Sequence, residues 1–336
     1  MAKILRQTTV IRDGMHNAFT DLQFWQGAYW VTYRKGAGHT SMDAHAVVAL
    51  SHDRHRFTEI STSRVKGDVR DPKLLPLGDD RMALYYPSWI EGAGNYEVDG
   101  YKRLKPIQQY ITFSSDGQSW EPVRPILERN MWLWRIRPHG GRFYGLIQNL
   151  TAPYGGDGPQ RPHQLDLAVS DNLIEWQTIA RVGTGLNESD IYWHADGEAW
   201  IISRTIKATN SCFATAKPPY TDWSSVELEP MVHAPNMLEH EGALYVAGRS
   251  NPLTEGEPVA PCGDNSLSIW RLERNRLVPI LRIPAYGDCS YPGFIKDPAG
   301  RICLSYYSQH AYYLGVVTPP LAHYMPSDVY FAELEL

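Results

Sequence analysis

The sequence predicts an all-β protein whose repeated sheets form a six-bladed β-propeller. A unit of nearly fifty residues recurs, in which an apolar strand follows a glycine or acidic turn and leads into a further strand. The segments with the pattern of second strands begin at Gly27, Asp80, Gly141, Gly197, Gly242 and Gly300. No segment shows a sustained helical period, and the 24 prolines would break most helices. Repeated small sheets of this size are typical of propellers.

The remaining strands follow in the same order along the chain. Third strands are expected within AVVALSHDRHRFTEI, QQYITFSSDGQSWEPV, HQLDLAVSDNLIEWQTI, SCFATAKPPYTDWSSVEL, NSLSIWRLERNRLVPI and SDVYFAELEL. The N-terminal KILRQTTVIR has strand character but no partner in the first unit, so we expect it to form the outer strand of the last blade and close the ring. Residues 1–336 would then form a single propeller domain. Segments 87–106, 151–162, 252–264 and 309–327 are expected to be loops that frame the channel mouth.

Charge and composition narrow the classes of partner. The chain has 32 Lys and Arg against 37 Asp and Glu, without long runs of like charge, which does not indicate a nucleic-acid or membrane surface. No stretch approaches the ~20 apolar residues of a membrane span, and the first residues lack the apolar core of a secretory signal. We therefore expect a cytoplasmic protein, or one exported with a leader absent from this chain, and a monomer.

Cysteine and histidine spacing predicts no metal site and no cofactor. The four cysteines form no CxxC pair, and the 12 histidines form no HxH or HxxxH cluster. Free buried thiols are expected, although Cys289 and Cys303 are near enough in sequence to leave a disulfide open.

The first strand of each propeller blade lines the central channel, so equivalent residues of the six units converge on one pocket. The sequence places these anchors there, with Arg70 and Trp134 beside two of them: Asp21, Asp71, Arg135, Glu188, Asn236 and Tyr291. Buried polar groups at this density cost several kcal/mol unless they pair with one another or with a ligand. Two explanations stay open: a substrate pocket, or ion pairs of Arg70 with Asp71 and of Arg135 with Glu188 that hold the blades together.

Arginines end three of the second strands. Arg34 ends VTYR, Arg204 ends IISR and Arg249 follows AG in AGRS. A guanidinium presents a planar fork that suits a carboxylate or vicinal hydroxyl groups, although an arginine at a strand end is often only a solvated charge. Arg204 and Arg249 have equivalent places near the channel mouth and are therefore candidates for substrate binding.

Several segments resemble the sialidase superfamily, whose six-bladed propellers carry turns called Asp boxes. FSSDGQSW is similar to a shortened Asp box, and LSHDRHRF and VSDNLIEW resemble it less closely. LNESDIYWHADGEAWIISR resembles the family segment that brings a catalytic Glu and then an Arg of the arginine triad, here Glu188 and Arg204. CSYPGF resembles the segment of the nucleophilic tyrosine, here Tyr291, and Arg249 falls where the third arginine is expected.

The likeness extends over the whole chain and is greatest to bacterial exo-sialidase-like proteins. It implies that Asp43 is the general acid, with His39 close by, on the loop of YRKGAGHTSMDAHAVVALSHD. The main departure is FTDL, because sialidases have an arginine before Ile-Pro at this place. The first triad arginine is thus missing, and Asp21 would repel a sialic acid carboxylate. The resemblance implies an exo-acting glycoside hydrolase for a carbohydrate or glycoconjugate that need not be a sialoside.

Two mechanisms stay open for this pocket. In the first, Glu188 takes the proton of Tyr291, which attacks the anomeric carbon. In the second, the substrate is a neutral sugar, Tyr291 only hydrogen-bonds, and an acid and a base come from a set of four carboxyl groups: Asp21, Asp43, Asp71 and Glu188. In either mechanism we expect Arg70 to lower the pKa of Asp71.

Two other classes of function also remain open. A non-catalytic propeller could bind a glycan or a protein on its face. A propeller polysaccharide lyase would use a His and a Tyr to remove a proton next to a uronate carboxylate, and His39 and His310 are candidates for that base. Trp132, Trp134 and Trp193 could form a wall for stacking on sugar, or simply pack in the core.

Overall fold

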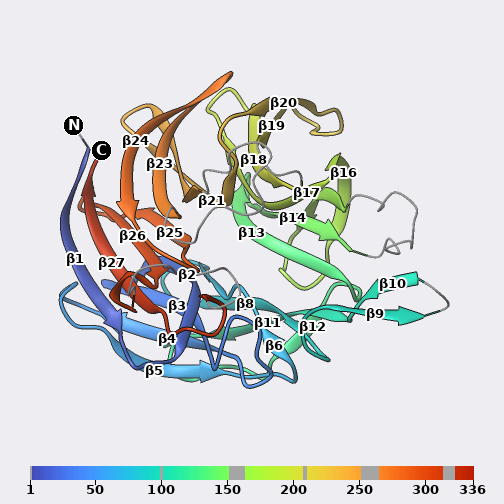
Figure 1. The fold of residues 1–336 in the computed structure, drawn as a ribbon. Coiled ribbons are helices and arrows are strands. Elements are labelled where there is room, and N and C mark those ends of the chain that lie inside the picture. The colour runs from blue at the N-terminus through green and yellow to red at the C-terminus, as the bar shows by residue number, and fades with distance from the viewer. Residues whose placement is uncertain (1, 99–100, 151–162, 207–209, 251–264, 313–321) are drawn as a thin grey trace.

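Six antiparallel sheets are arranged around a central axis in the computed structural model (Figure 1). It describes residues 2–98, 101–150, 163–206, 210–250, 265–312 and 322–336. The protein is all-β and has the six blades that the sequence repeat predicts. Across these ranges no helix is long and apolar enough to cross a membrane.

The first three blades contain residues 16–184. Blade 1 consists of β2 (His16–Trp25), β3 (Ala28–Gly36), β4 (His45–Ser51) and β5 (Thr58–Ser63). Blade 2 consists of β6 (Asp68–Val69), β7 (Lys73–Pro76), β8 (Met82–Trp89), β11 (Ile107–Ser114) and β12 (Arg124–Ile126). Blade 3 consists of β13 (Met131–His139), β14 (Arg142–Asn149), β15 (Gln164–Ser170) and β16 (Gln177–Thr184).

The other three blades complete the ring. Blade 4 consists of β17 (Leu186–Trp193), β18 (Ala199–Thr205), β19 (Ser211–Ala216) and β20 (Ser224–Leu228). Blade 5 consists of β21 (Val232–His240), β22 (Ala243–Ser250), β23 (Ser266–Glu273) and β24 (Arg276–Pro284). Blade 6 consists of β25 (Ser290–Lys296), β26 (Ile302–Ser308), β27 (Asp328–Glu335) and the N-terminal β1 (Lys3–Ile11).

The N-terminal strand closes the ring, as the sequence predicts. β1 pairs antiparallel with β27, from Lys3 opposite Glu335 to Ile11 opposite Val329. The two ends of the chain therefore lie side by side at the outer edge of blade 6 (Figure 1). This pairing covers the edge of β27 that would otherwise be open to other strands.

Apolar side chains fill the spaces between neighbouring blades. Each of the six large clusters joins two adjacent sheets, and the cluster between blades 6 and 1 closes the ring with Leu22 and Val31 packed near Val329 and Phe331. These side chains come from alternating positions of strands whose other face meets the next blade. The core is therefore a ring of six interfaces, and the channel at its centre is left to polar residues.

Three hairpin turns share one set of hydrogen bonds. The side-chain oxygens of Asp53, Asp116 and Asn172 each accept two backbone N–H groups, two and three residues further on. The serine two residues before each one accepts the backbone N–H three residues after itself. These turns link third to fourth strands at the outside of blades 1, 2 and 3, away from the channel.

The connections differ in part from the expected loops. Segment 87–106 includes a hairpin, β9 (Asn95–Val98) with β10 (Tyr101–Leu104), that projects from the ring (Figure 1). Segments 151–162 and 252–264 lie outside the described residues, and 309–327 is described only in part, with a short 3-10 helix at His310–Tyr312. Cys212, Cys289 and Cys303 are free thiols, so the Cys289–Cys303 disulfide does not form.

Candidate active site

The inner strands are interrupted at the same place in every blade. Five of them shift register there by a β-bulge, and in blade 2 the strand is broken between β6 and β7. In blades 1, 3, 4, 5 and 6 the first residue of the bulge is Phe19, Trp134, Asn187, Ala234 and Tyr291, respectively. The equivalent residue in blade 2 is Asp71, which lies two residues before strand pairing resumes at Lys73. Bulges of this kind re-aim side chains and are frequent next to active sites.

Four of these six positions have a left-handed backbone. The φ angle is 57° at Phe19, 41° at Asp71, 48° at Ala234 and 48° at Tyr291. A non-glycine residue in this region costs of order 1–3 kcal/mol and persists where the surrounding structure imposes it. The strain recurs at equivalent places around the channel, which points to one surface built by all the blades.

A pocket of about 180 Å³ opens above this surface. Five of the six bulge positions contribute to it, and the described residues that line it are Phe19, His39, Arg70, Asp71, Trp89, Trp132, Trp134, Gln148, Leu150, His163, Asn187, Glu188 and Tyr291. Its volume lies below the range of about 300–1,000 Å³ that is usual for drug-sized ligands. The pocket therefore suits one small ring rather than an extended chain.

Tyr291 and Glu188 are in direct contact in this pocket. The phenol of Tyr291 donates to Glu188 Oε1 at 2.5 Å. Arg204 Nη1 donates to both oxygens of Glu188, at 2.8 and 3.1 Å, and the backbone N–H of Ala234 lies 3.4 Å from Oε2. Glu188 is only 3% exposed. Its acceptor positions are thus occupied by protein groups, so Glu188 can act on a substrate mainly through Tyr291.

Burial keeps the phenol of Tyr291 protonated. Burial raises its pKa well above 10, and the negative charges of Glu188 and Asp71 raise it further. A tyrosinate forms here only if its proton moves to Glu188 while positive charge develops beside the oxygen. This arrangement suits a nucleophile that is activated during bond cleavage rather than before it.

Asp71 has a free carboxyl group that faces the pocket. No hydrogen bond joins its side chain to the described residues, and Oδ1 is buried without a partner. Burial raises the pKa of Asp71 to about 6, although Lys73 and Arg70 lower it. Arg70 thus lowers the pKa of Asp71 as the sequence predicts, but the net shift is upward because desolvation outweighs the neighbouring cations. A carboxyl group of this kind can donate a proton near neutral pH.

Arg70 forms its ion pair with Asp68 rather than with Asp71. Its Nε and Nη2 contact Asp68 Oδ2 at 3.0 and 2.9 Å, and Arg34 binds the other oxygen of Asp68 at 2.7 Å. Arg34 is completely buried, so the arginine that ends VTYR holds blades 1 and 2 together and does not reach solvent. Asp68, not Asp71, is thus the ion-pair partner of Arg70.

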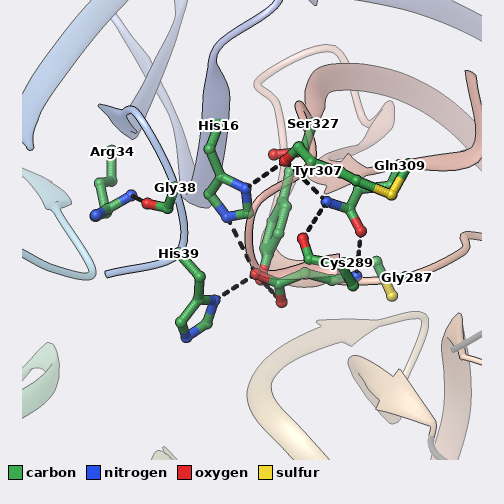
Figure 2. Close-up of polar contacts among 12 residues, drawn as sticks. His16, Arg34, Gly38, His39, Gly287, Cys289, Tyr307, Gln309 and Ser327 are labelled. Atoms are coloured by element: carbon green, nitrogen blue, oxygen red, sulfur yellow. Dashed lines mark hydrogen bonds and ion pairs between the residues drawn. The ribbon is translucent and has the colours of Figure 1, made fainter. Parts of the chain in front are cut away.

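His39 belongs to a buried network around Asp288. His39 Nδ1 lies 2.5 Å from Asp288 Oδ2, and His16 Nε2 lies 3.1 Å from the same oxygen. Figure 2 shows His16, His39 and Tyr307 converging from blades 1 and 6, and the Tyr307 phenol donates to Asp288 Oδ1 at 2.7 Å. Burial raises the pKa of Asp288, but the electrostatic interactions and hydrogen bonds of His39 and His16 outweigh it and hold this pKa well below its usual range.

The tautomer of His39 follows from its two neighbours. Nδ1 donates to Asp288, and Nε2 accepts from Arg70 Nη1 at 3.2 Å. Burial lowers the pKa of His39 to about 4. The ring is therefore neutral near pH 7 and presents a lone pair, not a proton, on the side of Arg70.

The three side chains His16, His39 and Asp288 are close enough to hold a metal ion. The donor set also fits hydrogen bonding alone, because Asp288 already accepts from both histidines and from Tyr307. Arg249 lies 3.5 Å from Asp288 Oδ1 and would repel a divalent cation. The cluster is thus satisfied without a metal, and no step of the chemistry is assigned to one.

Three predicted site residues lie in a layer below the pocket. Arg135 donates to Asp21 Oδ1 at 2.8 Å and to the carbonyl of Pro292 at 2.6 Å, and Asn236 donates to the same carbonyl at 3.1 Å. Asp21 also accepts the backbone N–H of Leu74 at 3.0 Å. These groups tie inner strands together across the channel. Arg135 pairs with Asp21 rather than with Glu188, so the expected ion pair has a different partner.

Four more candidates lie away from the described lining. Asp43 is exposed and accepts from the Ala37 N–H at 3.2 Å and from the Ser41 hydroxyl. His310 stacks on Tyr330 at a centroid distance of 4.7 Å. Arg204 and Arg249 approach from behind the reactive pair, since Arg204 holds Glu188 and Arg249 lies 5.8 Å from the centre of the Tyr291 ring.

Indole rings form one wall of the pocket. Trp132 and Trp134 are stacked at 4.9 Å with an angle of 22°, and Trp89 meets Trp132 edge to face at 6.3 Å. Trp193 is not in the described lining and stacks instead on His139. Two of the three tryptophans named from the sequence thus face the pocket, and Trp89 joins them.

Sequence reasoning missed Phe19, Asn187 and Asp288. Phe19 and Asn187 sit at bulge positions beside Asp21 and Glu188, and only knowledge of the bulge could have shifted the choice by one or two residues. Asp288 directly precedes CSYPGF, and its contacts with His16 and His39 come from segments about 250 or more residues away.

Comparison with solved structures identifies the relatives of this architecture. The NanB sialidase of Streptococcus pneumoniae superposes with a TM-score of 0.65 at 9% identity, covering 97% of this chain and 70% of that one. Trypanosoma rangeli sialidase superposes with a TM-score of 0.63 at 12% identity, over 98% of this chain. The fold is that of a sialidase-like propeller.

This sialidase-like propeller spans 58% of the length of the T. rangeli enzyme. A protein of unknown function from Dyadobacter fermentans matches it over its full length, with a TM-score of 0.75, 16% identity and coverage of 99% of that chain. No family model matches the sequence, and no curated protein does so. At these identities the likeness concerns the fold, and the chemistry must be argued from the residues.

Proposed function

We propose that this protein is an exo-acting glycoside hydrolase that cleaves a terminal sugar by a retaining mechanism. The observation that carries the proposal is the 2.5 Å contact between the Tyr291 phenol and Glu188 in the wall of a small pocket. Arg204 donates to both oxygens of Glu188, so Tyr291 is the group on which this carboxylate can act. Tyr291 and Glu188 are therefore arranged as a nucleophile and its base. The sialidase-like fold agrees with this chemistry.

In the first step, Tyr291 Oη forms a bond to the anomeric carbon while its proton passes to Glu188. The glycosidic bond breaks, and the leaving oxygen takes the proton of Asp71. In the second step, a water molecule attacks the anomeric carbon and gives a proton to Asp71. The bond from the anomeric carbon to Oη breaks, and Tyr291 recovers its proton from Glu188. Atoms and charges balance over the two steps, which together consume one water molecule.

We assign Asp71 as the proton donor because, among the described lining residues, its carboxyl group is the one without a hydrogen bond to the protein. Asp43, the general acid implied by the resemblance, is exposed and held by its own loop. His39 faces the pocket but has no proton to give on the side of Arg70. The elevated pKa of Asp71, about 6, suits a group that must donate and then accept.

Phe19 bears on the choice of sugar. The centre of its ring lies 4.9 Å from that of Tyr291, and Phe19 is only 2% exposed, so an apolar wall stands beside the Tyr291 ring. Arg70 and Arg34 lie 5.3 and 5.9 Å from the centre of the Phe19 ring, but both are already paired with Asp68, so a carboxylate on the anomeric carbon would find no unpaired cation there. We therefore expect an aldose rather than a sialic acid, held against Trp132 and Trp134 by one face of its ring.

The test is a hydrolysis screen with aryl glycosides, in which a sialoside is compared with neutral hexosides, pentosides and uronides. For the substrate that is cleaved, Tyr291→Phe and Glu188→Gln should each lower kcat by at least about 100-fold without loss of fold. Asp43→Asn is the matched control and should keep wild-type activity. Full activity in both the Tyr291 and Glu188 variants would refute the mechanism, and cleavage of the sialoside alone would refute the argument from Phe19.

A lyase is the second candidate, because the neutral imidazole of His39 faces the same pocket beside Arg70. A uronate carboxylate could replace His39 as the acceptor of Arg70 Nη1, which would free Nε2 of His39 to remove the neighbouring proton. The product would carry a carbon–carbon double bond that absorbs in the near ultraviolet. Its appearance with a uronate polymer, and its loss in His39→Gln, would favour this reaction over hydrolysis.

A further inference from the structure

A second, smaller chamber lies directly beneath the pocket. Its volume is about 10 Å³, and it shares Asp71, Trp134, Glu188 and Tyr291 with the pocket above. The floor is formed by Lys73, Arg135, Ser189, Ala234 and Pro235. A cavity needs roughly 10–15 Å³ and two or more polar partners to hold one water molecule. The chamber meets the lower limit of this size, and its otherwise mainly apolar lining includes four charged residues, namely Asp71, Lys73, Arg135 and Glu188.

Lys73 is the unexplained member of this chamber. Its side chain is 5% exposed, yet within the described ranges no hydrogen bond or ion pair reaches its Nζ atom. A buried ammonium without a partner costs several kcal/mol. Asp71 also lines the chamber, and its Oδ1 is buried without a partner among the described residues. One donor and one acceptor are thus left unsatisfied around the same small space.

We propose that a single water molecule occupies this chamber and joins Lys73 Nζ to the Asp71 carboxyl group, so that Lys73 positions and tunes the proton donor from below. The water resolves both unsatisfied groups at once, because it can accept from the ammonium and donate to Oδ1. The role of Lys73 in catalysis rests on the proposed function of Asp71, whereas the water and the charge coupling do not.

The electrostatic surroundings support a coupling between the two residues. Burial lowers the pKa of Lys73 to about 8, with Arg135 adding to the effect and Asp21, Asp71 and Asp190 opposing it. The groups that act on Asp71 are Lys73, Arg70 and Arg34, which lower its pKa, and Glu188, which raises it. Of these charges, Lys73 has the largest effect on the pKa of Asp71, so removing the Lys73 charge should change this pKa the most.

The first experiment is a high-resolution crystal structure of the wild-type protein without ligand. We expect one ordered water within hydrogen-bond distance of both Lys73 Nζ and Asp71 Oδ1. An empty chamber, or a direct contact between the two side chains, would overturn the proposal. This measurement does not depend on any variant or on activity.

The second experiment measures the Asp71 pKa by NMR of ¹³C-labelled aspartate carboxyl groups, with Asp71→Asn identifying the signal. Lys73→Met removes the charge at similar volume and should raise the Asp71 pKa by roughly one unit. Lys296→Met, at an exposed position of β25, is the control and should leave it unchanged. An unchanged Asp71 pKa in Lys73→Met would overturn the coupling.

If a substrate is found, the basic limb of the kcat/KM profile should move upward by the same amount in Lys73→Met. A moved NMR titration with an unmoved activity profile would show that Lys73 tunes Asp71 but that Asp71 is not the proton donor. The failure of the proposed function and the failure of this inference are therefore separate results.

Discussion

Replacing Asp71 by Asn should stabilise the protein while it removes activity. The pKa of Asp71 is about 6 in the folded protein and 3.8 in the unfolded reference, a difference of about 2 units. Each unit corresponds to about 1.4 kcal/mol, so the ionised carboxylate costs the folded state about 3 kcal/mol above pH 7. Asn has nearly the same shape, carries no charge, and accepts the left-handed backbone of this position more readily.

The sign of the pH dependence follows from the direction of the shift. Because the folded pKa is raised, the stability associated with the protonated group is fully present below about pH 4 and is lost as pH rises through about 6. The advantage of Asp71→Asn over the wild type should therefore be about 3 kcal/mol at pH 8 and only about 1 kcal/mol at pH 4.5.

Equilibrium unfolding in urea at the two pH values measures this difference. Asp79→Asn, at an exposed turn, is the matched control and should show no comparable gain at pH 8. An Asp71→Asn variant that is less stable than the wild type at pH 8, or equally stable at both pH values, would refute the view that Asp71 is a desolvated carboxyl group without a direct protein partner. Such a gain in stability with loss of activity is typical of catalytic groups.

Three further changes test the architecture. Arg135→Met leaves the buried carboxylate of Asp21 without its partner and should cost about 3–5 kcal/mol in urea unfolding, and the double variant with Asp21→Asn should recover part of it. Gly293→Ala places a methyl group 2.1 Å from the backbone nitrogen of Leu22, so the unfolding free energy should fall by about 3 kcal/mol. Deletion of residues 2–11 uncovers the edge of β27, and light scattering should show more association for this variant than for the full chain.

The fold was predictable because the repeat recurs in the sequence itself. The second and third strands lie where the apolar runs and their turns predict, and β1 was assigned to the last blade because it had no partner in the first unit. The β9–β10 hairpin was not predicted, since its residues lie outside the repeat.

The site was predictable only to within two residues. The six residues predicted to line the channel occupy three successive positions of the inner strands. Asp71 and Tyr291 are in the first position of the bulge or its equivalent, and Arg135 and Glu188 are in the second. Asp21 and Asn236 are in the third position, where strand pairing resumes. A bulge leaves no mark in the hydrophobic pattern, so spacing alone could not separate these levels. Asp21 and Asn236, in the third position, connect inner strands by hydrogen bonds instead of lining the pocket. In blade 1 the pocket is lined by Phe19, not by Asp21 as the sequence predicts.

The partners of charged groups were less predictable still. Arg70 precedes Asp71 in sequence but turns to Asp68, because the left-handed backbone at Asp71 sends the two side chains in different directions. Burial raises the pKa of Asp71 more than the neighbouring cations lower it, and a sequence does not show how deeply a side chain is buried. Asp288 contacts His16 across 272 residues, beyond the reach of any local motif.

The pairing of β1 with β27 has a consequence for biosynthesis. Tyr291 lies in blade 6 and Asp288 adjoins it, and this blade needs both β1 and β27, which lie on either side of the other five blades in the sequence. On the ribosome, β1 must wait unpaired while five other blades emerge and fold. Tyr291 is therefore fixed in place only after β27 has followed the other five blades from the ribosome, so a chain that stops before residue 328 holds blades 1–5 without a complete blade 6.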